Sequence, residues 1–335
     1  MPNNPKSLLL TSTLGLGIII SVSSSSWYGI WLGLEINLLS FVPLISHSLN
    51  QRITEAALKY FLVQAIASNI FLLRILILHD YQSSIIISIA SSSLLIKIGS
   101  APFHFWFPEV IEGLQWLHCL ILITIQKIAP LTLIRYIPIP FFFLSLVIIL
   151  SVIIGCLGGL NQTSIRKIIA FSSINHMGWI LSTFLLEDNS WLVYLFMYII
   201  LTVTATITFI MLRLHHINQI FNVKLQPITK LAIFSSLMSL GGLPPFLGFF
   251  PKWVVIIKLA NFSTFLILTV IIFTALLTLY FYLRIAFPVF TISSTHLYWL
   301  RNNSTKIYES TIISAAIIIS TLGLLICPVI TNYTI

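Results

Sequence analysis

Charged residues are scarce in this sequence. Only 7 % of its 335 residues are Asp, Glu, Lys or Arg, whereas 58 % are hydrophobic and the mean hydropathy is +1.04. Soluble domains carry about 25 % charged residues, so this composition excludes a water-soluble fold. The apolar runs recur from end to end, with no polar block large enough to fold by itself. We therefore predict a single transmembrane domain over residues 1–335 and no extramembrane catalytic domain.

Cysteines and cofactor motifs are scarce as well. Cys119, Cys156 and Cys327 lie far apart in apolar runs, so neither a disulfide framework nor a CxxC metal or cluster site is available. The pair His215-His216 has no Cys, Asp or Glu at ligand spacing, and no phosphate-binding glycine loop, flavin fingerprint or haem motif occurs. We predict no metal and no redox cofactor in this chain. The formal charge of +9 comes from Lys and Arg scattered singly over short loops, which argues against nucleic-acid binding.

Long hydrophobic runs are abundant instead. Helices and closed barrels both satisfy the backbone in lipid, but runs such as Ile85 to Ile98 lack the alternation of a barrel strand. The sequence therefore predicts an all-α polytopic membrane protein, whose first run we expect to be retained rather than cleaved as a signal peptide. Eleven runs near the spanning length of about 20 residues fall at residues 5–22, 26–46, 56–78, 82–112, 115–136, 139–159, 167–186, 190–213, 229–259, 263–287 and 309–331.

The fourth and ninth runs are too long for one ordinary span and contain helix breakers. Proline removes a helical hydrogen bond and glycine weakens the helix, so we predict discontinuous helices with breaks near residues 99–104 and 241–251. The breakers are Gly99 and Pro102 in the fourth run, and Gly241, Gly242, Pro244, Pro245, Gly248 and Pro251 in the ninth.

The distribution of basic residues predicts the orientation. When loops are assigned alternately to two sides, the side of the N-terminus collects ten basic residues: Lys6, Arg52, Lys59, Arg166, Lys167, Arg213, Lys224, Lys230, Arg301 and Lys306. The other side collects Arg74, Arg135 and Lys258, together with Asp80, Glu187 and Asp188. The positive-inside rule then places the N-terminus inside and, with eleven spans, the C-terminus outside.

Five ionisable residues remain at membrane depth: Glu35, Lys97, Lys127, Lys252 and Arg284. A charge at the bilayer centre costs roughly 2.5 to 3.5 kcal/mol on insertion scales, so such residues normally face a partner or a wet cavity. Arg284 lies near its helix end, where its long stem can reach the interface, so we assign it to topology. The other four are the candidate functional residues. Glu35 is about nine residues, or ~14 Å, into its span, and we expect it to be buried.

The placement of these residues favours a proton relay. Lys97 and Lys252 border the two breaks, where an interrupted helix can hold water at membrane depth. A carboxylate that moves relative to a desolvated lysine changes whether the lysine holds its proton. We therefore predict that Glu35 contacts Lys97 directly or through one water, and that Lys127 and Lys252 continue a polar axis. The alternative is structural ion pairing that only fixes the register of helices.

Three histidines are secondary candidates. His104 follows the first break, where it could shuttle protons or be a satisfied core residue, and His118 opens the fifth run. His176, in Ser-Ile-Asn-His-Met-Gly-Trp, could belong to a hydrated path or bond a neighbouring carbonyl.

These residues lie in motifs that resemble one known family. The sequence is similar to the mitochondrially encoded subunit 2 family of respiratory NADH:ubiquinone oxidoreductase (complex I), the antiporter-like subunits of its proton-pumping membrane arm. The motifs that carry the resemblance are Trp-Leu-Gly-Leu-Glu-Ile-Asn at 31–37, Glu-Ala-Ala-Leu-Lys-Tyr-Phe-Leu at 55–62, Lys-Ile-Gly-Ser-Ala-Pro-Phe-His-Phe-Trp at 97–106, Gln-Lys-Ile-Ala-Pro at 126–130, Gly-Gly-Leu-Asn-Gln-Thr at 158–163, Arg-Lys-Ile-Ile-Ala-Phe-Ser-Ser-Ile at 166–174 and Leu-Gly-Gly-Leu-Pro-Pro-Phe-Leu-Gly-Phe-Phe-Pro-Lys-Trp at 240–253.

The resemblance implies a role for each position. Glu35 would pair with Lys97 on the first broken helix, Lys127 would pass protons on, and Lys252 would lie at the exit side. It also implies an antiporter-like fold that lacks the first three helices. The chain departs from the family before the Lys127 helix, where it reads Leu-Gln-Trp-Leu-His-Cys at 114–119, and the loop at 288–308 is weakly characteristic.

The resemblance also implies a setting. NADH, FMN, iron-sulfur clusters and ubiquinone would be bound by other subunits, and the partners would be other membrane-arm subunits and lipids. The protein would lie in the mitochondrial inner membrane, with the N-terminus on the matrix side and the C-terminus on the intermembrane-space side. The alternatives are a stand-alone cation/proton antiporter of related fold, which would be active when purified alone, and a structural scaffold, which would tolerate neutral substitution of Lys97.

Overall fold

The fold is described from a computed structural model, which describes residues 5–46, 50–77, 84–186, 188–222, 227–262, 264–291, 311–321 and 323. Within these residues the secondary structure is helical, apart from one isolated β-bridge between Ser164 and His216. These helices contain many Val, Ile and Phe residues, which favour strands in soluble proteins. In lipid every backbone group must be hydrogen-bonded within the protein, and this requirement outweighs the preference for strands. The helices are α1 Pro5–Ser23, α2 Trp27–Ser46, α3 Gln51–Ile77, α4 Ser84–Ile98, α5 Trp106–Gly113, α6 Trp116–Ile123, α7 Ile125–Arg135, α8 Phe141–Leu160, α9 Ile165–Phe184, α10 Ser190–Leu212, α11 Ile217–Asn222, α12 Pro227–Gly241, α13 Phe249–Asn261 and α14 Phe265–Thr291.

Most of the predicted spans coincide with helices. Seven segments of the described chain are long and apolar enough to cross a membrane, and they match the first, second, third, fifth, sixth, eighth and tenth predicted runs. The seventh run is α9, and the fourth and ninth are each divided into two helices. Of the eleventh run, the helix Thr311–Thr321 is described. The rest of that run, Cys327 and most of the 288–308 loop lie outside the described residues, so the count of eleven remains a prediction.

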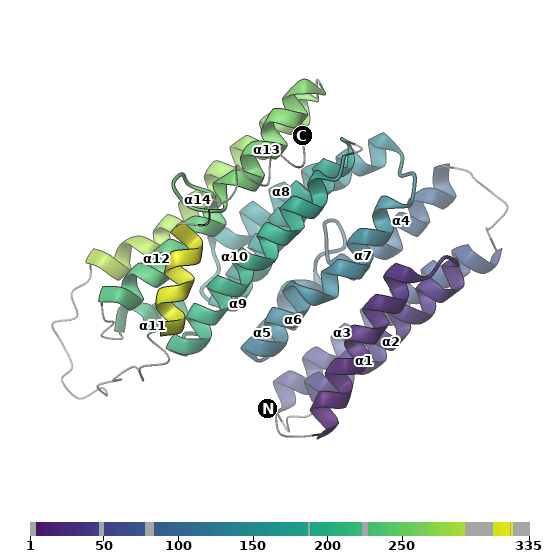
Figure 1. Cartoon of the computed structure of the whole chain (residues 1–335), viewed down its shortest axis with the longest axis horizontal. Coiled ribbons are helices and arrows are strands. Elements are labelled where there is room, and N and C mark those ends of the chain that lie inside the picture. The colour runs from purple at the N-terminus through teal and green to yellow at the C-terminus, as the bar shows by residue number, and fades with distance from the viewer. Residues whose placement is uncertain are drawn as a thin grey trace. The chain divides into compact units, whose positions relative to one another are not determined.

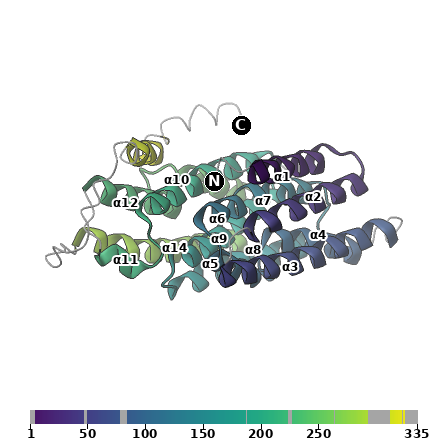
Figure 2. The same cartoon turned by 90° about the horizontal axis from the view of Figure 1, so that it is seen from below.

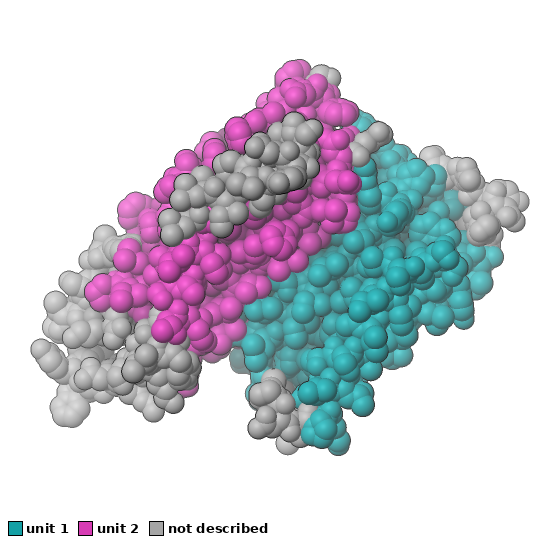
Figure 3. Space-filling view, in the orientation of Figure 1, with its two compact units in different colours: residues 1–147 teal, residues 148–335 magenta. Residues whose placement is uncertain are grey.

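The chain forms two compact units, residues 1–147 and 148–335, coloured separately in Figure 3. In the first unit α1, α2 and α3 run side by side (Figure 1), and α3 packs against α4 and α5. Figure 2 shows α1 and α2 in one layer of this unit and α3 and α4 in another. Glu35, Lys97 and Lys127 all belong to this unit, on α2, α4 and α7.

In the second unit α9 is the central helix. Nearly all of its residues are buried, including polar ones such as Ser173, Asn175 and His176. It packs against α10 and α13, while α12 packs against α10 and α14. A helix that is buried all round need not be amphipathic, which is why α9 carries more polar residues than its neighbours. Lys252 and His176 belong to this unit.

The first predicted break is confirmed. α4 ends at Ile98 and α5 begins at Trp106. Gly99 has φ of +75°, a conformation that suits glycine, and the amide of Ser100 donates to the carbonyl of Leu95, which closes the helix end. The indole of Trp106 donates to the carbonyl of Ile96 at 3.2 Å, and the amide of Gln64 donates to the carbonyl of Lys97 at 3.4 Å. The carbonyls freed by the break are therefore satisfied inside the protein.

The second break is confirmed too and follows the same pattern. α12 ends at Gly241 and α13 begins at Phe249. Gly242 also has φ of +75°, and the amide of Leu243 donates to the carbonyl of Met238. Pro251 lies in the first turn of α13, where a missing N–H leaves no helical bond unmade. Both units thus contain a half-helix that ends in a left-handed glycine, a short loop and a second half-helix.

The fifth run coincides with one apolar span, Trp116–Arg135, in which the helix is not regular throughout. It is interrupted at Thr124, between α6 and α7. The Thr124 hydroxyl donates back to the Leu120 carbonyl at 2.7 Å, a contact that bends helices. Pro130 further along α7 removes another helical hydrogen bond. Lys127 consequently lies in the first turn of α7 rather than in the middle of a straight helix.

Candidate functional site

Lys97 lies in the last turn of α4, immediately before the first break, and is buried. Its side chain borders a cavity of about 20 Å³, which exceeds the roughly 10–15 Å³ that one water molecule needs. The other polar residues around this cavity are Asn37, Tyr60, Gln64 and Gln126. A buried ammonium beside a cavity with several polar partners is where water can be held at membrane depth.

Asn37 and Gln126 form the polar wall of this cavity. Asn37 Nδ2 donates to Gln126 Oε1 at 2.8 Å, and Gln126 Nε2 donates back to Asn37 Oδ1 at 3.0 Å. The Tyr60 hydroxyl approaches the same oxygen of Gln126 at 3.5 Å. The amide pair joins α2 to α7, the helices of Glu35 and Lys127, and so sets their spacing. The sequence did not point to these neutral residues, although Gln126 is adjacent to Lys127 and Asn37 follows shortly after Glu35.

The Asn37–Gln126 amide pair predicts that removing one partner destabilises the protein more than removing both. Gln126→Leu leaves the buried Asn37 amide without its partner, and we expect the free energy of unfolding to fall by about 1–3 kcal/mol. The double variant Asn37→Leu/Gln126→Leu removes both polar groups and should recover part of that loss. The measurement is the thermal stability of the assembled protein in membranes. A double variant as unstable as the sum of the two single variants would contradict this reading of the pair.

Glu35 is only partly buried, so the prediction of full burial was wrong. It lies at the edge of the buried face of α2, which is formed by residues such as Gly33, Leu34 and Asn37. Within the described part of the chain, no ion pair within 4.0 Å joins Glu35 to Lys97, so the predicted direct contact is not formed. A contact through one water remains a prediction.

Lys127 is buried and follows Gln126 directly in α7. Its ammonium nitrogen lies 4.5 Å from the centroid of the Phe107 ring, a cation–π contact that stabilises a charge without a carboxylate. Phe107 also borders the cavity beside Lys97. Lys127 itself does not line this cavity, but it contacts Phe107 and follows Gln126, and both of these residues border the cavity together with Lys97.

Lys252 is buried in the first turn of α13, in the second unit. Its ammonium donates to the carbonyl of Gly241, the last residue of α12, at 2.7 Å. The negative end of the α12 dipole and this otherwise unbonded carbonyl both stabilise the positive charge. The ammonium also lies 5.6 Å from the centroid of the Trp179 ring. The predicted continuation of the polar axis from Lys127 to Lys252 runs from one unit to the other and stays a prediction.

The three histidines have different surroundings. His104 is buried inside the first break, with its ring 4.3 Å from that of Phe105, and His118 is buried in α6. In the second unit, Nδ1 of His176 lies 3.1 Å from the Tyr194 hydroxyl. His215 lies between α10 and α11, where burial and the neighbouring Arg166 and His216 lower the pKa of its imidazole.

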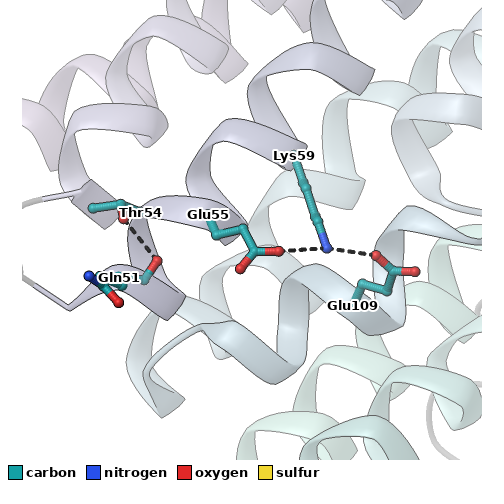
Figure 4. Close-up of polar contacts among 5 residues, drawn as sticks. All are labelled: Gln51, Thr54, Glu55, Lys59 and Glu109. Carbon is teal, nitrogen blue, oxygen red and sulfur yellow. Dashed lines mark hydrogen bonds and ion pairs between the residues drawn. The ribbon is translucent and has the colours of Figure 1, made fainter.

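Charged groups at the helix ends pair across helices of the same unit. Figure 4 shows the Lys59 ammonium of α3 between two carboxylates, 3.0 Å from Glu55 and 3.0 Å from Glu109 of α5. In the second unit Lys258 pairs with Asp188 at 3.0 Å, and Arg284 donates to the Leu160 carbonyl at the end of α8 at 3.1 Å. In each contact, the two residues lie near loops that the predicted orientation places on the same side of the membrane. Arg284 lies within α14, beside the end of α8, and its assignment to topology stays a prediction.

Comparison with known proteins identifies relatives over most of the chain. Residues 24–278 match the profile of the family described as NADH:quinone oxidoreductase/Mrp antiporter, TM. NADH-ubiquinone oxidoreductase chain 2 of Anopheles gambiae is 50 % identical over 297 residues, which cover 86 % of this chain and 87 % of that protein. The protein of the same name from Aedes aegypti is 45 % identical over 324 residues, 94 % of each chain.

Solved structures show the same fold. A chain of respiratory complex I from Thermus thermophilus has a TM-score of 0.83 and 25 % identity, over 97 % of this chain and 80 % of that one. A chain of the Mrp complex from Dietzia has a TM-score of 0.76 and 20 % identity, over 84 % of this chain and 60 % of that one, and is similar in fold alone. By sequence and by fold, this chain belongs to the transmembrane family shared by NADH:quinone oxidoreductases and Mrp antiporters.

Proposed function

We propose that this chain is a proton-translocating membrane-arm subunit of the respiratory NADH:ubiquinone oxidoreductase and moves protons through Glu35, Lys97, Lys127 and Lys252. The observation that carries the proposal is the position of Lys97, a buried lysine at a helix break that borders an amide-lined cavity. The relatives named NADH-ubiquinone oxidoreductase chain 2 support the assignment to this complex.

The proposed proton movement begins in the first unit. While the Glu35 charge is near, it stabilises the ammonium form of Lys97. When that charge is withdrawn or neutralised, the desolvated ammonium gives its proton to water in the cavity, and Lys127 takes it up on the other side of Gln126. The Phe107 ring stabilises the new ammonium. Lys252, held on the end of α12, receives the proton in the second unit and passes it on. His104 and His176 are secondary members of the path.

The partly exposed Glu35 supports a partner subunit. A carboxylate facing lipid at membrane depth costs several kcal/mol, and a neighbouring protein surface with a basic or hydrogen-bonding group would remove that cost. We propose that other membrane-arm subunits and lipids surround the chain, and that NADH, FMN, the iron-sulfur clusters and ubiquinone are bound by other subunits. Conformational or electrostatic change caused by quinone reduction elsewhere would reach this subunit through Glu35.

The proposed location is the mitochondrial inner membrane, as the names of the relatives support. The ten-to-three division of basic residues favours the N-terminus in the matrix and the C-terminus in the intermembrane space. The cross-helix contacts of Lys59, Lys258 and Arg284 support the underlying alternation of loops. We also propose that the two units belong to one transmembrane domain.

Lys127→Met in the assembled complex tests the role of α7. Methionine keeps much of the side-chain volume but cannot take up a proton, so we expect NADH:ubiquinone turnover coupled to proton release to fall at least about threefold. Leu131→Met, a buried change of similar size one turn further along α7, is the control and should leave turnover near the wild-type value. Turnover is measured in proteoliposomes per mole of assembled complex. Equal turnover in the Lys127 variant and wild type would exclude Lys127 from the path.

A further inference from the structure

α9 presents a set of buried polar groups on the face that packs against α10 and α13. His176 and Trp179 are three residues apart and therefore lie on one face of the helix. Nδ1 of His176 lies 3.1 Å from the hydroxyl of Tyr194 on α10, and both residues are buried. The Tyr194 ring in turn stacks on Trp179, with centroids 6.4 Å apart and an interplanar angle of 18°. Tyr194 therefore touches two residues of the α9 face.

The same group of residues reaches Lys252. The Lys252 ammonium lies 5.6 Å from the centroid of the Trp179 ring, and Trp179 has no exposed surface. Lys252, Trp179, Tyr194 and His176 thus form a continuous buried cluster drawn from α13, α9 and α10. The indole ring can stabilise a nearby cation but cannot carry a proton at neutral pH, whereas the imidazole of His176 can.

A hydroxyl is a suitable partner for a histidine that changes its protonation state. It donates to Nδ1 when the imidazole is neutral, and it accepts from Nδ1–H when the ring is an imidazolium. Hydrogen bonds to charged groups are the stronger ones, so losing this partner penalises the imidazolium most. Tyr198, one turn along α10, places its ring 5.3 Å from that of His176 and is equally buried. It offers a ring contact comparable to that of Tyr194.

We propose that Tyr194 is the positioning residue that holds His176 ready to exchange a proton with Lys252. This inference rests on the proposed proton-translocating function. In the exchange one proton moves from Lys252 to His176, so that the ammonium becomes an amine and the imidazole becomes an imidazolium; the reverse step restores both. Tyr194 keeps its own proton and only reorients its O–H bond.

The pH dependence of this exchange also depends on the other titratable groups around α9. The elements packed against this part of α9 contribute Tyr194 and Tyr198 from α10, Lys252 from α13, Cys156 from α8 and, next to the two tyrosines, Tyr282 from α14. Tyrosine and thiol groups buried in this way are neutral near pH 7. Lys252 and His176 are then the two groups of the cluster whose charge changes.

The test is Tyr194→Phe in the assembled complex, with Tyr198→Phe as the matched control. NADH:ubiquinone turnover is measured from pH 6.5 to pH 8.5 and divided by turnover with an artificial acceptor at the flavin, which corrects for the amount of complex. Without the hydroxyl the imidazolium loses the Tyr194 oxygen as an acceptor, so we expect turnover to fall about threefold or more at high pH and much less at low pH. The profile of Tyr198→Phe should match that of the wild type.

Two outcomes overturn the inference: an unchanged profile in Tyr194→Phe, or the same change in Tyr198→Phe, which would reflect packing alone. If Tyr194→Phe does not assemble, His176→Gln decides, because it removes the group that takes up the proton and should lower turnover across the whole pH range, and an unchanged profile would overturn the inference. Lys252→Met separates this inference from the proposed function. Full turnover in Lys252→Met would remove the relay itself, whereas low turnover there with a normal Tyr194→Phe profile would remove only the role of Tyr194.

Discussion

Replacing Lys97 with methionine is expected to lower proton-coupled NADH:ubiquinone turnover of the assembled complex at least about tenfold. Lys97 is the buried ammonium next to the first break, and it shares a cavity with the amides that lead to Lys127. Methionine fills a similar volume and needs no hydrogen-bond partner, so the fold should tolerate it. The chain should therefore insert and assemble normally, and reduction of an artificial acceptor at the flavin should be unchanged.

Lys59→Met is the control for this prediction. Lys59 lies in the same unit, on α3, but its side chain is exposed and pairs with carboxylates at the rim. Exposed ion pairs contribute little, and the residue does not border the cavity, so turnover should stay near the wild-type value. Equal losses in the two variants would mean that turnover responds to any lost lysine charge, and the special role of Lys97 would be refuted.

Gly248→Ala is expected to prevent normal assembly of the protein. Gly248 precedes α13, and a Cβ atom there would overlap the carbonyl oxygen of Ser239 in α12 and press on Leu201 of α10. The two halves of the broken helix are also joined by the contact between Lys252 and Gly241. An overlap with backbone destabilises by about 3 kcal/mol or more. The amount of assembled complex after gentle solubilisation, measured by native electrophoresis, should fall to a small fraction of wild type.

Gly241→Ala is the matched control in the same break. A Cβ atom at Gly241 would meet only the Tyr282 ring, at an ordinary contact distance of 3.5 Å. Gly15→Ala in α1 serves as a second control because nothing lies within 4 Å of its added Cβ. Both variants should assemble at close to the wild-type level. Normal assembly of Gly248→Ala would show that α12 and α13 approach each other less closely than the structure indicates.

The features best predicted from the sequence are those that depend on residues of a single segment. Glycine and proline act on the backbone of their own segment, so the clusters at Gly99 and Gly242 predicted both breaks. Charged residues are so costly in lipid that their mere presence selected Lys97, Lys127 and Lys252, all of which are buried. The motifs around the same residues resembled the family to which the chain belongs.

Features that depend on a distant partner were not predicted. The Asn37–Gln126 pair joins residues 89 positions apart, and the bond from His176 to Tyr194 depends on how α9 packs against α10. Neutral amides and hydroxyls also cost less in lipid than charges, so they do not stand out in a hydrophobic run. The break at Thr124 was missed for a related reason, because a threonine that bonds back to its own helix resembles an ordinary helical residue in sequence. Full burial of Glu35 was assumed from depth alone, which does not say which face of α2 is covered.

In the proposed relay, Lys97 carries the transported proton. The most direct measurement records NADH oxidation and proton release together, in proteoliposomes that contain the assembled complex with Lys97→Met. The relay predicts that turnover coupled to proton release is largely lost while flavin-site activity and assembly persist. Full turnover with an undiminished proton-to-electron ratio would contradict it and would show that the lysine is structural.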